Sequence, residues 1–217
     1  MKNLNWTSRS DAACLLVPHQ FSDRSQKVTR VLIGMIVFLS SAVSWACQTS
    51  DNLVQNCGFT TDASGWQTET GTCARDGSSG ASGVGNMTCN SFMGGAGHVA
   101  RFRRCLLAAD GVSGGRTYNY SAYGQLVSGS GVNCVVEIAD FTSNNCLNNV
   151  NSASTFLALA TSPNYAPSIA ATYSVAPNTV SAHVRIECTS PSSAFQVRVD
   201  DIYVGVPDPI FKSGFET

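Results

Sequence analysis

Cysteine is the residue type that most constrains the fold of this chain. Nine cysteines occur in 217 residues, and eight of them follow a short apolar run at residues 31–43. An even number of cysteines in an exported chain predicts a disulfide framework, here of up to four bridges, whose connectivity the count alone does not define. The eight are Cys47, Cys57, Cys73, Cys89, Cys105, Cys134, Cys146 and Cys188.

Spacing along the chain favours one set of disulfide pairs. Two pairs would each close a local loop, a third would join two strands, and the fourth is what remains. Each bridge would stabilise the fold by about 2–4 kcal/mol. A zinc–thiolate site is disfavoured, because the chain has no C-x-x-C motif and its cysteines are widely spaced. The expected pairs are Cys73 with Cys89, Cys134 with Cys146, Cys105 with Cys188, and Cys47 with Cys57.

The apolar run and its flanks are typical of a secretory signal. Lys27 and Arg30 precede the run, and the small residues Ser44 and Ala46 follow it, as expected around a cleavage site. The run has 13 residues, whereas a membrane-spanning helix needs about 20, so no transmembrane anchor is expected. We predict that residues 1–46 are an export signal region. Cleavage near Ala46 would release a secreted protein, periplasmic or extracellular.

Two points at the amino-terminal end stay open. Residues 1–26 precede the charged flank and resemble neither a signal nor a folded segment, so a start codon later than Met1 is an alternative. Cleavage after Ala46 would make Cys47 the first residue and a candidate for lipidation. The residues before Cys47 lack the leucine that a lipidation signal carries.

The charge balance argues against a nucleic-acid partner. The 171 residues after Ala46 (217 less 46) contain eight Lys or Arg and twelve Asp or Glu, for a formal charge near −4. Nucleic-acid binding needs a basic face. One basic cluster, Arg101, Arg103 and Arg104, alternates along a predicted strand. We interpret this cluster as a solvated strand face in preference to an anion site.

Short strand patterns recur between Gly, Ser and Asn clusters, and helical periodicity is rare. Such a pattern predicts an all-β, two-sheet β-sandwich over residues 47–205. Residues 206–217 are expected to form a tail, because the prolines of VPDP end the last strand. Glycine-rich residues 71–86 are expected to form a loop, and residues 128–133 a hairpin turn. Strands are predicted at residues 52–55, 99–106, 117–127, 134–141, 155–159, 168–175, 180–188 and 195–204.

Alternation along the predicted strands separates an apolar side from a polar side. The apolar side holds Val180, Ala182, Val184, Ile186 and Cys188 in one strand, Cys134, Val136 and Ile138 in another, and Tyr118, Tyr120 and Ala122 in a third. If these strands are neighbours, one sheet carries a common polar face. Its side chains would be Tyr123, Gln125, Glu137, His183, Arg185 and Glu187.

Three phrases of the sequence resemble the jelly-roll, galactose-binding-like carbohydrate-binding modules attached to bacterial cellulases and xylanases. NLVQNCGFTTDASGWQT (52–68) resembles their opening Asn-Leu phrase, which a Gly-Trp follows. GGRTYNYSAYGQ (114–125) resembles an internal Gly-x-x-Tyr strand, and FQVRVDDIYVG (195–205) resembles their closing Val-Asp-Asp-Val strand. The phrases occur in the family's order and frame nearly the whole domain. The chain departs from the family at Thr60, where the family has Glu, and at Tyr123, where it has Trp.

The resemblance implies a jelly roll that holds a glycan along one sheet. Aromatic rings would stack on the C–H faces of sugars, and polar side chains would hold the hydroxyl groups. A solvated sheet face is the alternative interpretation. Trp66, in the Gly-Trp of the family phrase, is expected to pack in the core. The candidate ligand-binding residues are Tyr123, Gln125, Glu137, Arg185 and Glu187.

The resemblance also implies a structural calcium ion, which needs six to eight oxygen ligands. Asp200 or Asp201 would supply carboxylate oxygens, with backbone carbonyls near Asn56 and Gly58. Thr60 removes one acid that the family uses. The alternative is that Asp200 caps a turn or pairs with an arginine.

These features predict a secreted, non-catalytic protein that resembles a carbohydrate-binding module and binds a polysaccharide or glycan. One alternative is a structural or adhesive surface protein without a sugar site. Another is a small glycoside hydrolase with a carboxylate pair among Glu137, Asp140 and Glu187. Enzymatic activity is disfavoured, because His98 and His183 lie in no recognisable catalytic phrase.

Overall fold

The computed structural model describes Cys47 and residues 49–207. The predicted export signal region lies outside the described residues, as does the tail beyond Pro207. All described residues belong to one compact unit, Val43–Thr217.

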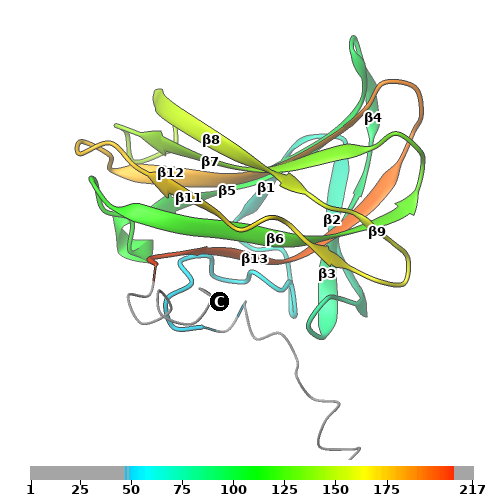
Figure 1. The fold of residues 1–217 in the computed structure, drawn as a ribbon, viewed down its shortest axis with the longest axis horizontal. Coiled ribbons are helices and arrows are strands. Elements are labelled where there is room, and N and C mark those ends of the chain that lie inside the picture. Colours follow the sequence, from blue (N-terminus) through cyan, green and yellow to red (C-terminus); the bar gives the residue numbers. More distant parts are fainter. Residues whose placement is uncertain (1–46, 48, 208–217) are drawn as a thin grey trace, which may run out of the picture. The chain divides into compact units, whose positions relative to one another are not determined.

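The described chain folds into two β-sheets that pack face to face, as Figure 1 shows. The six-stranded sheet has the order β1-β5-β12-β7-β8, with β4 also paired to β5. The seven-stranded sheet has the order β10-β6-β13-β3-β2, with β9 and β11 also paired to β6. The all-β, two-sheet jelly-roll sandwich predicted from the sequence is therefore confirmed. The strands are β1 (Trp66–Thr70), β2 (Thr72–Ser79), β3 (Val84–Asn90), β4 (Phe92–Gly94), β5 (Gly97–Leu107), β6 (Thr117–Ser128), β7 (Asn133–Phe141), β8 (Asn149–Leu157), β9 (Ala160–Thr161), β10 (Ala166–Pro167), β11 (Ala171–Ser174), β12 (Ser181–Ser190) and β13 (Gln196–Gly205), with one short 3-10 helix, η2 (Ala108–Asp110).

Two local predictions are wrong. Residues 71–86 do not form a loop, because β2 and the start of β3 lie there as part of a hairpin whose register shifts between Asp76 and Ser79. Glycine and serine at this irregularity hide the strand pattern. Residues 52–55 form no strand; Asn52 makes an isolated bridge to Gly205. β1 was not predicted either; its residues, mostly polar, pair with β5.

The predicted apolar sides form the core between the sheets. Tyr118, Tyr120 and Ala122 of β6 are at most 1% exposed, and the inward residues of β7 and β12 are equally buried, apart from Val180 at the start of that pattern. Trp66 packs between the rings of Phe59 and Phe102. Alternation thus predicted which side of β6, β7 and β12 is buried.

The connection from β6 to β7 differs from the prediction. Residues 128–133 were expected to join two neighbouring strands of one sheet, but β6 and β7 belong to different sheets. The segment crosses the edge of the sandwich instead. This crossing moves the outward side chains of β6 to the opposite side of the molecule from those of β7.

All eight cysteines that follow Ala46 form disulfides, but two of the predicted pairs are wrong. The bridges Cys47–Cys57 and Cys73–Cys89 are as expected. Cys134 pairs with Cys188 and not with Cys146, because β7 and β12 are neighbours and these two residues face each other in register. Cys146 instead pairs with Cys105 of β5. The exchange follows from strand order, which sequence spacing does not reveal.

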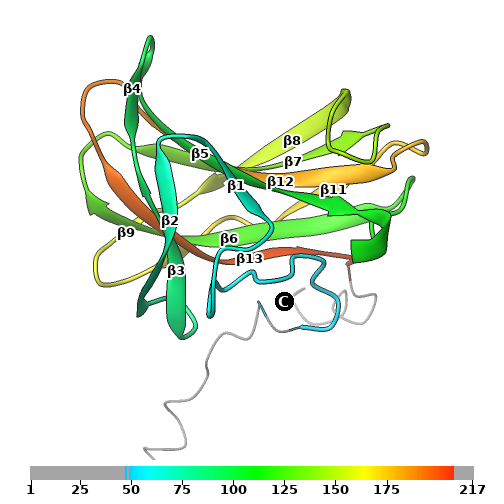
Figure 2. The same cartoon turned by 180° about the vertical axis from the view of Figure 1, so that it is seen from behind.

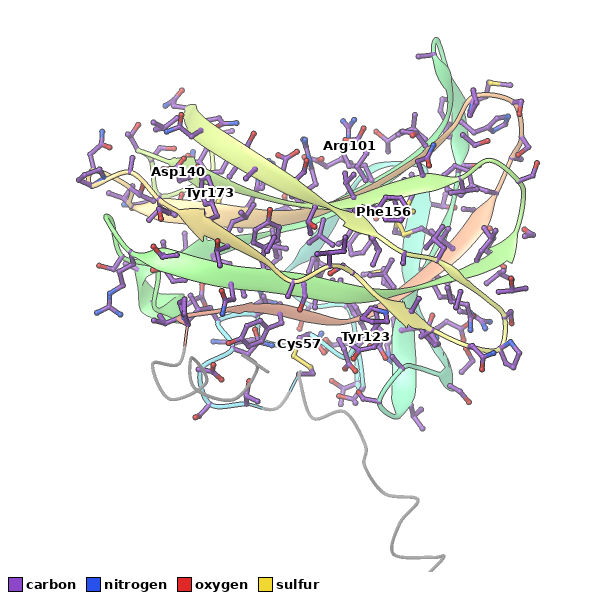
Figure 3. The ribbon with its side chains drawn as sticks, in the orientation of Figure 1. Cys57, Arg101, Tyr123, Asp140, Phe156 and Tyr173 are labelled. Carbon is purple, nitrogen blue, oxygen red and sulfur yellow. A yellow bond between two sulfur atoms is a disulfide. The ribbon has the colours of Figure 1, made fainter. Side chains whose placement is uncertain are left out.

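One buried carboxylate links the two sheets. Asp140 points inward from β7 and is 0% exposed. Its Oδ1 accepts hydrogen bonds from the Tyr173 hydroxyl of β11 at 2.8 Å and from the Asn151 amide, and its Oδ2 accepts from the Ala176 amide and the Thr179 hydroxyl. Figure 3 shows Asp140 beside Tyr173. Burial opposes ionisation, but the four hydrogen bonds prevail and hold the pKa of Asp140 below its ordinary value.

Replacing Cys134 and Cys188 together by alanine is expected to lower the free energy of unfolding by about 4 kcal/mol, because the bridge closes a long loop of the unfolded chain. Urea unfolding of the oxidised proteins measures the change. Non-reducing peptide mapping provides the check on connectivity: a peptide joining Cys134 to Cys146 would contradict the observed pairs.

The Asp140→Asn substitution is expected to destabilise the fold by about 2–4 kcal/mol at pH 7, because an amide nitrogen would face hydrogen-bond donors. A lowered folded-state pKa stabilises the fold above the pKa of the unfolded carboxyl, about 3.9, and this stabilisation is lost as the pH falls through the folded-state pKa. The difference between wild type and variant should therefore shrink below about pH 4. Urea unfolding from pH 3 to 7 measures it, and a constant difference would refute this assignment.

Candidate functional site

The side of the six-stranded sheet that faces away from the core is the candidate site, and we call it the outer sheet face. Figures 1 and 2 show that this sheet bends, so that its outer side is concave between the β4–β5 hairpin and the opposite strand ends. The strands run along the direction of bending. An elongated ligand lying at right angles to the bend on the concave side would therefore cross the strands and meet side chains from several of them.

Strand register places the outward side chains in rows that cross the sheet. The first row contains Arg101 of β5, Glu187 of β12, Val135 of β7 and Phe156 of β8. The second row contains Gln67 of β1, Arg103 of β5, Arg185 of β12, Glu137 of β7 and Ser154 of β8. Neighbouring strands lie about 4.8 Å apart, so the four strands of the first row span roughly 14 Å and the five strands of the second row span roughly 19 Å. The rows are long enough for an oligosaccharide.

Ion pairs connect most of the charged groups of the two rows. Arg101 Nε donates to Glu187 Oε2 at 2.9 Å, and Arg185 Nη2 donates to Glu137 Oε2 at 2.6 Å. Glu69 of β1 lies 3.1 Å from Arg103 Nε and 4.0 Å from Arg101 Nε. These side chains remain between 15% and 31% exposed, so solvent reaches them although their positions are restricted.

Glu137 is the most enclosed of these carboxylates. Burial opposes its ionisation, but hydrogen bonds to His183 and Arg185 outweigh it and lower the pKa of Glu137. His183 Nε2 lies 3.3 Å from Glu137 Oε1, and the imidazole packs on the Phe141 ring. This environment keeps Glu137 ionised, which suits a fixed hydrogen-bond acceptor better than a proton donor.

Apolar side chains flank the charged groups. Phe156 is 50% exposed at the end of the first row. Phe92 of β4 is 63% exposed and pairs with Val99 of β5. Exposed aromatic rings of this kind stack on the C–H faces of sugars.

The expected common face is wrong for two of its members. Glu137, Arg185 and Glu187 share the outer sheet face, but Tyr123 and Gln125 belong to β6, in the other sheet. Gln125 is 1% exposed, and its amide donates to the Asn164 carbonyl. Figure 3 shows Tyr123 on the opposite side of the sandwich from Arg101. The cause is the crossing between β6 and β7.

Sequence reasoning also missed residues of the face. Arg101 and Arg103 were interpreted as a solvated strand face together with Arg104, but Arg104 points inward and donates to the Ser64 carbonyl. Phe156 lay in a predicted strand whose neighbours were unknown. Its place opposite Val135 would have been visible only once β8 was paired with β7.

Only two of the three carboxylates considered for hydrolysis share one surface. Asp140 lies inside the sandwich, bound to four donors, whereas Glu137 and Glu187 lie on the outer sheet face. Arg185 sits between them, 2.6 Å from Glu137 and 3.8 Å from Glu187.

The two aspartates predicted to bind calcium lie in β13, under the hairpin of β2 and β3. Asp200 and Asp201 are at most 1% exposed. The Ala81 amide donates to Asp200 Oδ2, and the Ser82 hydroxyl donates to Asp201 Oδ1. Asp200 Oδ1 and Asp201 Oδ2 are buried without a hydrogen-bond partner. Burial, followed by the charge of Asp201, raises the pKa of Asp200 to about 7.

The backbone near the aspartates partly matches the expected calcium ligands. Gly58 packs on Asp201, since a Cβ at Gly58 would lie 3.5 Å from Asp201 Oδ1. A Cβ at Gly80 would overlap the Gly85 carbonyl and Asp200 Oδ2, so glycine lets these oxygens approach. The Asn56 carbonyl accepts from the Trp66 indole at 3.4 Å and its side chain binds Asp62.

A pocket of about 360 Å³ lies nearby, between the amino-terminal segment and the turn after β2. Three of its polar side chains already bind within the protein: Asn52 to the Ile202 carbonyl, Gln55 to Asp110, and Ser82 to Asp201. The outer sheet face therefore offers the better site for a polar ligand.

Comparisons of the sequence with known families and curated proteins find no relative. No family model matches the chain, and no curated protein sequence is similar to it. Within the described residues, no helix has the length and apolar character to span a membrane.

Solved structures are similar to this chain at low sequence identity. The family 16 carbohydrate-binding module-2 is 13% identical with a TM-score of 0.53, covering 70% of this chain and 99% of the module. The CBM22-1–GH10 modules of Clostridium thermocellum xylanase 10B, complexed with xylohexaose, are 15% identical with a TM-score of 0.55, covering 74% of this chain and 29% of that one. The enzymatically active domain of bacteriophage CBA120 tailspike protein 4 is 14% identical with a TM-score of 0.54, covering 71% and 21%.

This chain thus covers about a fifth of the tailspike domain and under a third of the xylanase fragment, but nearly all of the family 16 module. The resemblance inferred from three short phrases is confirmed at the level of architecture. The described chain has the two-sheet jelly-roll fold of carbohydrate-binding modules.

Proposed function

We propose that the chain is exported and, after cleavage near Ala46, acts as a non-catalytic carbohydrate-binding module that holds a glycan on the outer sheet face. The observation that carries this proposal is the register of four strands, β5, β12, β7 and β8. It places the exposed ring of Phe156 in line with Val135, Glu187 and Arg101. An apolar platform beside positioned donors and acceptors is the combination that sugar recognition needs.

The remaining features support export and binding. Four disulfides fit an oxidising compartment. The ion pairs hold the charged side chains in place before a ligand arrives, which reduces the entropy lost on binding. Tyr123 and Gln125 play no part in this proposal, since they lie in the other sheet.

Phe156→Ala is expected to weaken retention on the bound polysaccharide by about two- to tenfold, because it removes a stacking platform. Pull-down on insoluble cellulose, xylan, mannan and pectin measures retention. Val84→Ala is the matched control, because Val84 is 61% exposed and lies in β3 of the other sheet. Melting temperatures of both variants verify that they fold.

The same assay separates the alternatives. Retention of the wild type on no glycan would favour a structural or adhesive surface protein. Release of reducing sugar by the wild type, abolished in Glu137→Gln, would favour a small hydrolase. Equal retention of wild type and Phe156→Ala would remove Phe156 from the site.

We also propose that Asp200 and Asp201 bind a structural calcium ion. Each aspartate has one buried carboxylate oxygen without a hydrogen-bond partner, and a divalent cation would neutralise their charges. Gly58, which lies beside Asp201, and Gly85, whose carbonyl oxygen approaches Gly80 together with Asp200 Oδ2, would supply carbonyl oxygens. A bound calcium would supply a fixed positive charge joining β13 to the β2–β3 hairpin.

Calcium at 100 times its dissociation constant is expected to raise the free energy of unfolding by about 2.7 kcal/mol over the chelated protein. Thermal unfolding in EGTA and in calcium chloride measures the shift, and Asp201→Asn should abolish it. Magnesium serves as the control ion. No heat on calorimetric titration after chelation, with an unchanged melting temperature, would exclude the site.

A further inference from the structure

Two arginines face each other at the centre of the outer sheet face. Arg103 of β5 and Arg185 of β12 are direct cross-strand partners, and Arg101 lies two residues before Arg103 on the same side of β5. Like charges placed directly opposite each other destabilise a sheet. This pair therefore requires compensation, which neighbouring carboxylates or a bound anion can supply.

The neighbouring carboxylates use only part of the hydrogen-bonding capacity of these arginines. A guanidinium carries five N–H donors. Arg185 donates to Glu137 through Nη2, and its Nε is buried without an acceptor. Arg103 Nε lies 3.1 Å from Glu69 in an ion pair that lacks hydrogen-bond geometry. Within the described part of the chain, the two Nη groups of Arg103 have no hydrogen bond.

The acidic partners orient the arginines without covering them. Glu69 holds Arg103 from the β1 side, and Glu137 holds Arg185 from the β7 side. Both arginine side chains remain 24% exposed. The space between the two strands is thus bordered by guanidinium groups with donors to spare, in a geometry that suits a planar carboxylate.

From this arrangement, and resting on the proposed glycan site, we infer that the outer sheet face selects acidic polysaccharides, with Arg103 and Arg185 together binding the carboxylate of a uronic acid residue. Glu69 and Glu187 retain acceptor oxygens for sugar hydroxyl groups. Arg101, already bound to Glu187, adds positive charge beside the pair.

The position of Phe156 indicates a polymer as the ligand. Phe156 lies two strands from Arg185 and one row away, which places their Cα atoms roughly 10–12 Å apart. One sugar ring is too small to contact both. A sugar bound at the arginine pair and another stacked on Phe156 would belong to one chain that crosses the strands, so a single uronic acid should bind weakly.

Affinity electrophoresis and calorimetry with polygalacturonate test this inference, and carboxyl-reduced polygalacturonate is the matched neutral ligand. The wild type is expected to bind the acidic polymer at least about tenfold more tightly than the reduced one, since charge-assisted hydrogen bonds are lost on reduction. Rising salt should weaken binding to the acidic polymer. Galacturonic acid monomer should compete poorly.

Arg103→Gln is the decisive variant, because it removes donors from a partly exposed side chain and leaves the core intact. It should weaken binding to polygalacturonate by about tenfold, with a smaller effect on any neutral glycan. Arg103→Lys should restore only part of the affinity, since lysine offers a point charge without the planar fork. Arg116→Gln, at an exposed position before β6, removes the same charge elsewhere and should leave binding unchanged.

Other binding results would contradict either the carboxylate preference alone or the glycan site as well. Equal binding to polygalacturonate and its reduced form, or to polygalacturonate and neutral xylan, would overturn the inference and leave the proposed glycan site standing. Equal effects of Arg103→Gln and Arg116→Gln would mean that binding depends on the net charge of the protein and not on the arginine pair. That result would also overturn the inference. Preference for dextran sulfate over polygalacturonate would overturn the choice of a carboxylate. Binding to no polysaccharide would remove both proposals.

Discussion

The packing of inward side chains between the two sheets is the constraint on which the rest of this structure depends. The inward side chains that occupy alternate positions of β7 and β12 are at most 1% exposed: Val136 and Ile138 in β7, and Val184 and Ile186 in β12. Because the period of a strand is two residues, burying one set of side chains presents the other set to solvent. The charged rows of the outer sheet face are thus the direct counterpart of the core. A slip of one residue in β7 or β12 would bury Glu137 and Arg185 and expose the core.

The charged network reflects a balance between stability and ligand contact. Three arginines and three glutamates lie close together on the outer sheet face, so their charges nearly cancel, and each pair on its own contributes little to stability. What the network provides is position, because each guanidinium is directed by a carboxylate on a neighbouring strand. Asp140 has the opposite role. It is fully satisfied inside the sandwich and holds β7 to β11.

Local pattern predicted most of the fold, and strand order accounts for most of the errors. Alternation in β6, β7 and β12 correctly assigned buried and outward residues, since this property depends only on the strand itself. Which strands are neighbours depends on contacts distant in sequence. For that reason Tyr123 and Gln125 were grouped with Glu137, and Cys105 and Cys134 were given each other's partners. Glycine and serine residues made the strand pattern of the β2–β3 hairpin unrecognisable. The place of Phe156 on the outer sheet face depends on its pairing with Val135.

The tip of the β4–β5 hairpin is a position at which this domain can accept insertions. The tip carries Gly94, Gly95, Ala96 and Gly97, and Phe92 and Met93 are more than 60% exposed. No disulfide anchors it, whereas Cys105 and Cys134 tie β5 and β7 elsewhere. Insertions at the tip would consequently alter one end of the outer sheet face while the register of the central strands stayed fixed. Descendants of such a protein could acquire new ligand preferences by lengthening this hairpin, without rebuilding the scaffold beneath it.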